Sequence, residues 1–193
     1  MAKMPVMGRV KTRLAADIGA VAATGFYRRE LSAVLRRLAR DRRWRTWVAV
    51  APDTAVGQPF WPRDVEQFAQ GPGDLGQRMG RVLRALPPGP AIVVGSDIPA
   101  LSASHVAEGF ALLGSHDAVF GPATDGGYYL VGLKRLPKPL DPFADIRWSG
   151  PHALADTLAN LAGRRVAFVA TLADIDTGED LRVFYAGGQL FFC

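Results

Sequence analysis

The chain has 193 residues, of which 49% are hydrophobic and 21% are charged, proportions typical of one globular domain with a sizeable core. They disfavour intrinsic disorder, a coiled coil and a small disulfide-stapled scaffold. The net charge of +5 is uneven, because residues 1–45 carry 12 Lys and Arg against 3 Asp and Glu. A basic first quarter facing an acidic remainder indicates an anionic ligand held between them.

Several other classes of protein are disfavoured by particular residues. The single cysteine, Cys193, provides neither an intrachain disulfide nor a thiolate metal cluster. No apolar run approaches the roughly 18 to 20 residues of a membrane helix, and the first residues lack a signal-peptide core. The short Arg and Trp cluster at 42–47 is too little to predict nucleic-acid binding. We therefore expect a cytoplasmic protein with no membrane span and no nucleic-acid partner.

Strands and helices are predicted to alternate along the chain. Helical spacing of apolar residues and short, wholly apolar strands give these elements after a basic loop at 3–13: helix 26–38, strand 47–51, helix 77–86, strand 91–95, helix 104–113, strands 118–120 and 128–133, helix 151–161 and strand 166–170. This order predicts a single domain, 1–193, built as an α/β/α sandwich around a mostly parallel sheet. Ligands of such sheets bind beyond the carboxyl ends of the strands.

The basic loop before the first helix is a candidate phosphate site. Gly8 permits a tight backbone path, and four cations fall within 11 residues: Lys3, Arg9, Lys11 and Arg13. Such a loop can offer backbone N–H groups, a helix dipole and side-chain charge to a phosphate. A solvated basic terminus is the alternative, and the Walker A pattern is absent.

A glycine pattern at 71–76 formally matches the dinucleotide fingerprint, with Asp97 following about 20 residues later. Its context is poor, because the segment before it is a weak strand and Pro72 stiffens the turn. The alternative is a plain loop in which Asp74 caps the next helix.

Acidic residues follow several of the predicted strands. Asp97 comes after strand 91–95, where a carboxylate can hold a divalent metal. Asp125 begins an Asp-Gly-Gly sequence that is also a hairpin signal. Four acids lie within residues 174–180, where capping of the last helix by Asp176 or Thr177 is the structural alternative.

Taken in order, several segments carry a family resemblance: 3–14 (KMPVMGRVKTRL), 73–79 (GDLGQRM), 95–99 (GSDIP), 121–130 (GPATDGGYYL), 148–149 (WS) and 174–181 (DIDTGEDL). The sequence resembles domain of unknown function 2064, a family of small bacterial GT-A-fold proteins. Some of its members are called arsenosugar-biosynthesis glycosyltransferases. More distantly, it is similar to guanylyl- and cytidylyltransferases of the same fold.

The resemblance implies a transferase that uses Mg²⁺ or Mn²⁺, a nucleotide-diphospho-sugar or nucleoside triphosphate, and a small-molecule acceptor. It implies that Asp97 and Asp176 are metal ligands and that Asp125 is catalytic. The residues implied in nucleotide and phosphate binding are Lys3, Gly8, Arg9, Lys11, Arg13, Gly73, Asp74 and Arg78. We prefer glycosyl transfer, because the loop at Asp125 resembles that of the family members called glycosyltransferases. Nucleotidyl transfer and a non-catalytic nucleotide-binding protein are the alternatives.

The sequence also departs from the family pattern. Gly178 replaces a usual proline, Thr124 replaces a common glutamate, and Lys3 follows two residues rather than a full apolar strand. A truncated first strand would leave backbone groups unpaired. We therefore expect the sheet to close over the gap, to recruit residues 189–192, or to pair with another chain as a homo-oligomer. A form extended upstream is expected to be more stable.

Overall fold

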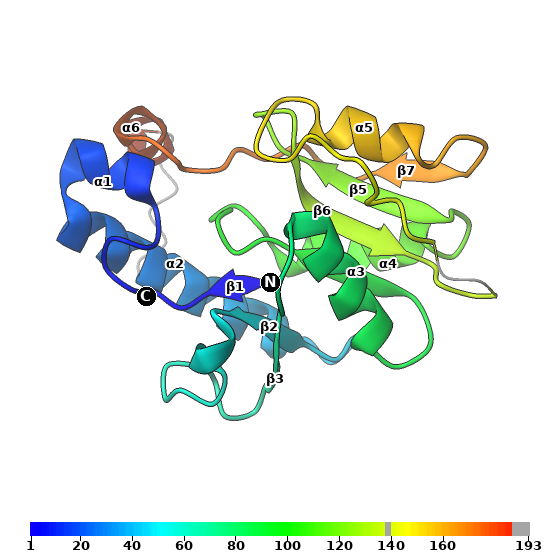
Figure 1. Cartoon of the computed structure of the whole chain (residues 1–193), viewed down its shortest axis with the longest axis horizontal. Helices are drawn as coiled ribbons and strands as arrows, with labels where there is room; N and C mark the ends of the chain where they lie inside the picture. The colour runs from blue at the N-terminus through cyan, green and yellow to red at the C-terminus, as the bar shows by residue number, and fades with distance from the viewer. Residues whose placement is uncertain (138–139, 187–193) are drawn as a thin grey trace.

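The predicted alternation of strands and helices is present in the computed structural model, which describes residues 1–137 and 140–186 (Figure 1). The elements are β1 (Ala2–Lys3), α1 (Thr12–Ile18), α2 (Ala20–Ala39), β2 (Trp47–Ala51), a 3₁₀ turn (Asp53–Ala55), β3 (Glu66–Ala69), α3 (Leu75–Ala85), β4 (Ala91–Val94), α4 (Ala103–Leu112), β5 (Ala118–Pro122), β6 (Tyr128–Leu133), α5 (Ala153–Ala159), β7 (Val166–Phe168) and α6 (Gly178–Ala186). No helix within those described residues is both long and apolar enough to span a membrane.

The strands form two sheets, with orders β1-β2-β3 and β4-β6-β5-β7. All pairs in the first sheet are parallel, as is the β5–β7 pair, whereas β6 runs antiparallel to both β4 and β5. The α/β class with a mostly parallel arrangement is therefore confirmed. The two sheets meet where the Met1 nitrogen donates to the Val94 carbonyl at 2.7 Å.

Helices cover both faces of the second sheet, which explains why its strands are apolar throughout. Successive side chains of a strand point to opposite faces. Val93, Phe120 and Val131 pack with residues of α3 and α5, whereas Val119 and Leu130 pack with residues of α2 and α4. The two clusters lie on opposite sides of the same strands and form the layered core of the molecule.

Helix α2 covers the first sheet with its apolar face. Tyr27, Leu31 and Leu35 pack against Val48 and Val50 of β2, all of them buried. The outward positions of this helix carry exposed arginines: Arg28, Arg29, Arg36 and Arg40. The predicted amphipathic helix with a cationic outer side is confirmed.

Two helices begin with the capping that their sequences allow. The Gln77 N–H donates to the Asp74 carboxylate at 2.8 Å, and the Gln77 side chain accepts from the Asp74 N–H. The same reciprocal pair joins Thr177 and Asp180 at the start of α6. The capping alternatives for Asp74 and for the last helix are therefore realised.

Strand β1 is two residues long, and it pairs with β2 through Ala2 opposite Val50 and Lys3 opposite Ala51. Residues 189–192, which we expected as a possible replacement strand, lie outside the described residues. The greater stability of an upstream-extended form stays a prediction.

Gly76 of α3 tests how tightly the loop before α5 is seated. A methyl group there would lie 2.8 Å from both the Phe143 carbonyl and the Trp148 ring. We predict that Gly76→Ala lowers the free energy of unfolding by about 1 to 3 kcal/mol, measured by thermal and denaturant melting. Gly25→Ala in α2 is the matched control, because its methyl would meet only Arg29 at 3.5 Å.

That control should gain about 0.5 to 1 kcal/mol from better helix propensity. If Gly76→Ala proved as stable as the unmodified protein, the close packing of this loop on α3 would be wrong.

Candidate active site

The loops that follow β1, β4, β5 and β7 surround one cavity of about 470 Å³, here called the sheet-edge cavity. Its position beyond the carboxyl ends of strands is where ligands of α/β sheets bind. The side chains that can carry chemistry there include Lys3, Arg9, Lys11, Asp97, Asp125, Tyr128, Trp148 and Asp174.

Lys11 joins two of the predicted metal ligands. Its ammonium lies 3.2 Å from an Asp97 oxygen and 2.8 Å from an Asp176 oxygen, and its side chain is only 3% exposed. Burial lowers the pKa of Lys11, but the charges and hydrogen bonds of Asp97 and Asp176 outweigh it and raise the pKa above its ordinary value. Lys11 therefore carries a positive charge between two carboxylates.

The backbone of Lys11 is in the left-handed region, with φ 47° and ψ 48°, directly before α1. This conformation is uncommon for a residue with a side chain and costs about 1 to 2 kcal/mol. Val10 and Leu14 on either side are buried and hold the loop in place. Such strain is typical of functional sites.

Asp176 reaches Lys11 because α6 packs against α1. Leu14, Ile175 and Leu181 belong to one apolar cluster, and the Gly178 N–H donates to the Asp17 carboxylate at 2.6 Å. A proline at 178 could not donate this bond, and a Cβ on Gly178 would approach the Asp17 Cβ to 2.9 Å. The departure from the family pattern at Gly178 therefore has a physical reason in this chain.

Asp97 is the end of a buried polar chain. Ser96 Oγ lies 3.2 Å from an Asp97 oxygen and 3.2 Å from the Tyr27 hydroxyl, which also bonds the backbone of Lys3. Burial, with a contribution from the charge of Asp97, raises the pKa of Tyr27 to about 12. The network ties the end of β4 to α2 and β1, and it fixes the position from which Asp97 emerges.

Asp125 occupies the turn between β5 and β6, and its carboxylate accepts from the Gly127 N–H at 2.8 Å. Gly126 has φ 86°, and a Cβ there would come within 2.4 Å of the Pro151 carbonyl. The turn therefore rests closely on the start of α5. The hairpin alternative is correct, and the same residue also lines the sheet-edge cavity.

Asp174 adds a further carboxylate that the sequence did not single out. Burial raises its pKa, and the charges of Asp176 and Asp125 raise it further. The signal was present in the acid-rich run at 174–180, but spacing alone did not separate a cavity residue from helix-capping ones.

The predicted phosphate residues lie at different depths around this cavity. Lys3, Arg9 and Lys11 line it, whereas Arg13 does not, and its side chain is 76% exposed and 3.7 Å from Asp176. Gly8 has φ 75° in the turn that precedes Arg9. Sequence reasoning thus placed the loop correctly beside the acidic residues, while the roles in phosphate binding stay predictions.

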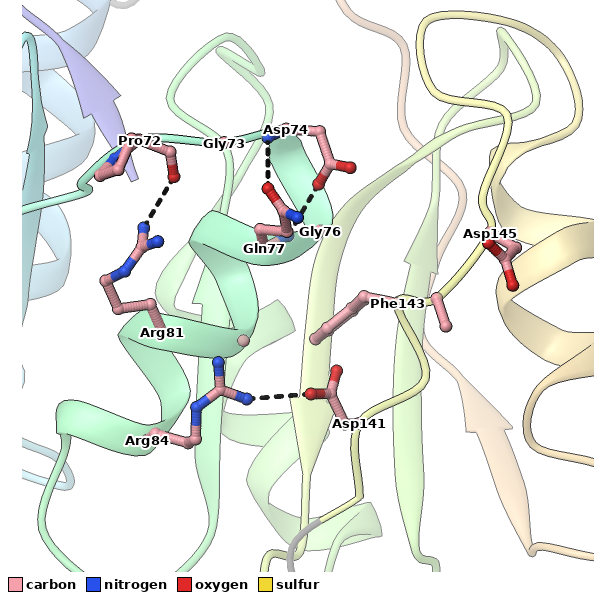
Figure 2. Close-up of a pocket in the computed structure, with 12 residues that line it drawn as sticks. Pro72, Gly73, Asp74, Gly76, Gln77, Arg81, Arg84, Asp141, Phe143 and Asp145 are labelled. Atoms are coloured by element: carbon pink, nitrogen blue, oxygen red, sulfur yellow. Dashed lines mark hydrogen bonds and ion pairs between the residues drawn. The ribbon is translucent and has the colours of Figure 1, made fainter.

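Gly73 and Asp74 line a separate cavity of about 710 Å³ beside α3, and Arg78 lines neither of these two cavities. In Figure 2 several of the charged side chains there already have partners: Asp74 caps α3, Arg81 donates to the Pro72 carbonyl, and Arg84 bonds Asp141 at 2.9 Å. Although it is larger, this cavity brings no carboxylates together on a cation. The structure therefore does not bring these three predicted nucleotide-binding residues to Asp97.

Asp97 and Asp176 are the residues that could hold a divalent metal. Their carboxylates, 47% and 38% exposed, aim one oxygen each at a single cation, and hard oxygen ligands suit Mg²⁺ and Mn²⁺. Among the described residues no set of three or more His, Cys, Asp or Glu is arranged to hold a metal. The protein would thus supply two of the coordinating oxygens, and a bound phosphate and water would supply the others.

Two comparisons with known proteins found matches to this chain. A crystal structure titled a "putative nucleotide-diphospho-sugar transferase" from Desulfovibrio desulfuricans G20 matches with a TM-score of 0.90 and 29% sequence identity, over 98% of this chain and 86% of that one. No curated protein matches the sequence. Residues 34–150 match the family model described as "Uncharacterized protein conserved in bacteria (DUF2064)", and the chain belongs to that family, as its motifs had indicated.

Proposed function

We propose that this protein is a divalent-metal-dependent glycosyltransferase whose donor is a nucleotide-diphospho-sugar. The observation that carries the proposal is that Lys11, in the basic loop that lines the sheet-edge cavity, contacts both Asp97, which lines the same cavity, and Asp176. The name of the similar Desulfovibrio protein supports the same class of donor.

The chemistry to be performed is departure of a nucleoside diphosphate from the sugar carbon. Negative charge grows on the diphosphate as this bond breaks, and fixed positive groups lower the energy of that state. Lys11 and Arg9 line the cavity and can bind phosphate oxygens there, and the exposed Arg13 adds positive charge beside Asp176. A metal held by Asp97 and Asp176 would supply Lewis-acid stabilisation of the same charge.

The acceptor would approach from the β5–β6 side of the cavity. Asp125 on the turn can take the proton of an attacking hydroxyl, because a positioned carboxylate is a competent general base. Tyr128 and Trp148 stand edge to face, with ring centroids 6.4 Å apart, and form an aromatic wall next to it. Asp174, whose carboxylate is close enough to Asp125 to interact with its charge, adds a second carboxylate to this side of the cavity.

The first test is binding of nucleoside diphosphates and diphospho-sugars by titration calorimetry, in Mn²⁺ and in EDTA. We expect binding only with metal, and we expect Asp97→Asn to weaken it about tenfold or more, because one of two protein ligands is lost. Asp141→Asn is the matched control, since Asp141 pairs with Arg84 at the other cavity.

Equal affinity in Mn²⁺ and EDTA would contradict the metal assignment. Products separate the two transfer reactions. Release of nucleoside diphosphate from a diphospho-sugar, with the sugar passed to an acceptor hydroxyl, supports glycosyl transfer. Release of pyrophosphate from a nucleoside triphosphate, with the nucleotidyl group passed to a phosphate oxygen of an acceptor, would instead make the protein a nucleotidyltransferase.

The basic loop should sense phosphate charge rather than the base. Arg9→Ala together with Arg13→Ala is expected to weaken diphosphate binding about tenfold or more, since charge-assisted bonds contribute about 1.5 to 3 kcal/mol each. Binding of the parent nucleoside should change little. Arg36→Ala together with Arg40→Ala, two exposed arginines at the end of α2, controls for the loss of two positive charges. A uniform loss for nucleoside and diphosphate would contradict the assignment of the loop to phosphate.

A further inference from the structure

The point between Asp97 and Asp176 is already filled by a cation of the chain itself. The Lys11 ammonium lies 3.2 Å and 2.8 Å from one oxygen of each carboxylate. These are the two carboxylates that would hold a divalent metal. A metal bound at this point would need the same two oxygens, so the ammonium and the metal cannot occupy it together.

We infer that Lys11 is an internal counter-cation that excludes divalent metal from Asp97 and Asp176 until a phosphate ligand draws the ammonium away. Metal and diphosphate would then bind cooperatively, because the diphosphate pairs with the ammonium that the metal displaces, and the metal pairs with the two carboxylates that the ammonium leaves. The exclusion of metal stands on the geometry of this chain alone. The identity of the phosphate ligand rests on the proposed function.

The environment of Lys11 makes this exchange specific. Its side chain is 3% exposed, so an ammonium without an anionic partner there would be strongly unfavourable. A metal that displaced it from Asp97 and Asp176 would leave it needing another anion. The sheet-edge cavity, which Lys11 lines together with Arg9, is where a diphosphate could provide one.

The chain's own architecture supports motion of the ammonium rather than of the carboxylates. Asp97 is tied to Ser96, and Asp176 is held at the capped start of α6 by its N–H bond to Asp180. A lysine, in contrast, is a point charge on a flexible four-carbon stem. Arg13 cannot replace it, because it is 3.7 Å from Asp176 and its side chain is 76% exposed.

The inference is tested by titrating Mn²⁺ into nucleotide-free protein and measuring free Mn²⁺ by electron paramagnetic resonance. Lys11→Met keeps a long unbranched side chain and removes the ammonium, so we expect Mn²⁺ to bind about tenfold or more tightly. Arg13→Met should change the affinity much less, and Lys134→Met, at the end of β6, should leave it unchanged. Adding Asp97→Asn to Lys11→Met should abolish the gain.

A second titration uses Mn²⁺–pyrophosphate as a preformed complex. Here the gain seen for Mn²⁺ alone should disappear or turn into a loss in Lys11→Met, because the variant lacks the ammonium that would contact phosphate as well as the one that competes for the carboxylates. A gain for the metal alone that is absent for the complex distinguishes an exchanging cation from a structural lysine, whose loss would weaken binding of both. Thermal melting checks that each variant is folded.

Equal or weaker Mn²⁺ affinity in Lys11→Met would overturn the inference. A gain that survives Asp97→Asn would also overturn it, because the metal would then lie elsewhere. If the unmodified protein ignores Mn²⁺–pyrophosphate while Lys11→Met still gains Mn²⁺ affinity, the exclusion holds and the proposed phosphate chemistry fails. If the complex binds but the variant gains no Mn²⁺ affinity, the proposed function survives and the inference falls.

Discussion

Mutual repulsion between carboxylates is the constraint on which the site depends. Asp97 and Asp176 aim oxygens at one point, and the raised pKa of Asp174 reflects burial first and then the charges of Asp176 and Asp125. A cluster of this kind is stable only with positive charge at its centre. Lys11 supplies that charge in the structure described here, and the strained backbone at Lys11 is the local cost of placing it.

The fold brings these groups together from distant parts of the chain. Asp97 leaves the end of β4, whereas Asp176 arrives on the long connection that runs from β7 across the molecule to α6, beside α1 (Figure 1). The Gly178–Asp17 hydrogen bond and the apolar contacts between α1 and α6 hold that connection in place. Asp176 is therefore held in place by the same helix that the basic loop leads into.

Local sequence signals predicted much of the fold. For the candidate site, they pointed to several of its residues but did not show which of these residues contact one another. Strands 47–51 and 128–133 have the predicted bounds, because wholly apolar runs ended by turns are unambiguous. The Lys11–Asp176 contact joins residues 165 positions apart, so no spacing rule could have shown it. The contact of Tyr27 with Ser96 could not be predicted for a different reason: in the sequence, a tyrosine on the apolar face of a helix looks like any other core residue. Asp74 fitted both a dinucleotide-binding fingerprint and a helix cap, and in the structure it caps α3.

If Asp97, Lys11 and Asp176 form one exchangeable cation and phosphate site, the exchange should be visible in a crystal structure of the protein with Mn²⁺ and a nucleoside diphosphate, with anomalous scattering to locate manganese. We expect a manganese peak between Asp97 and Asp176, and a Lys11 ammonium moved from both carboxylates onto a phosphate oxygen. Manganese bound elsewhere, with Lys11 still bridging the two carboxylates, would contradict it.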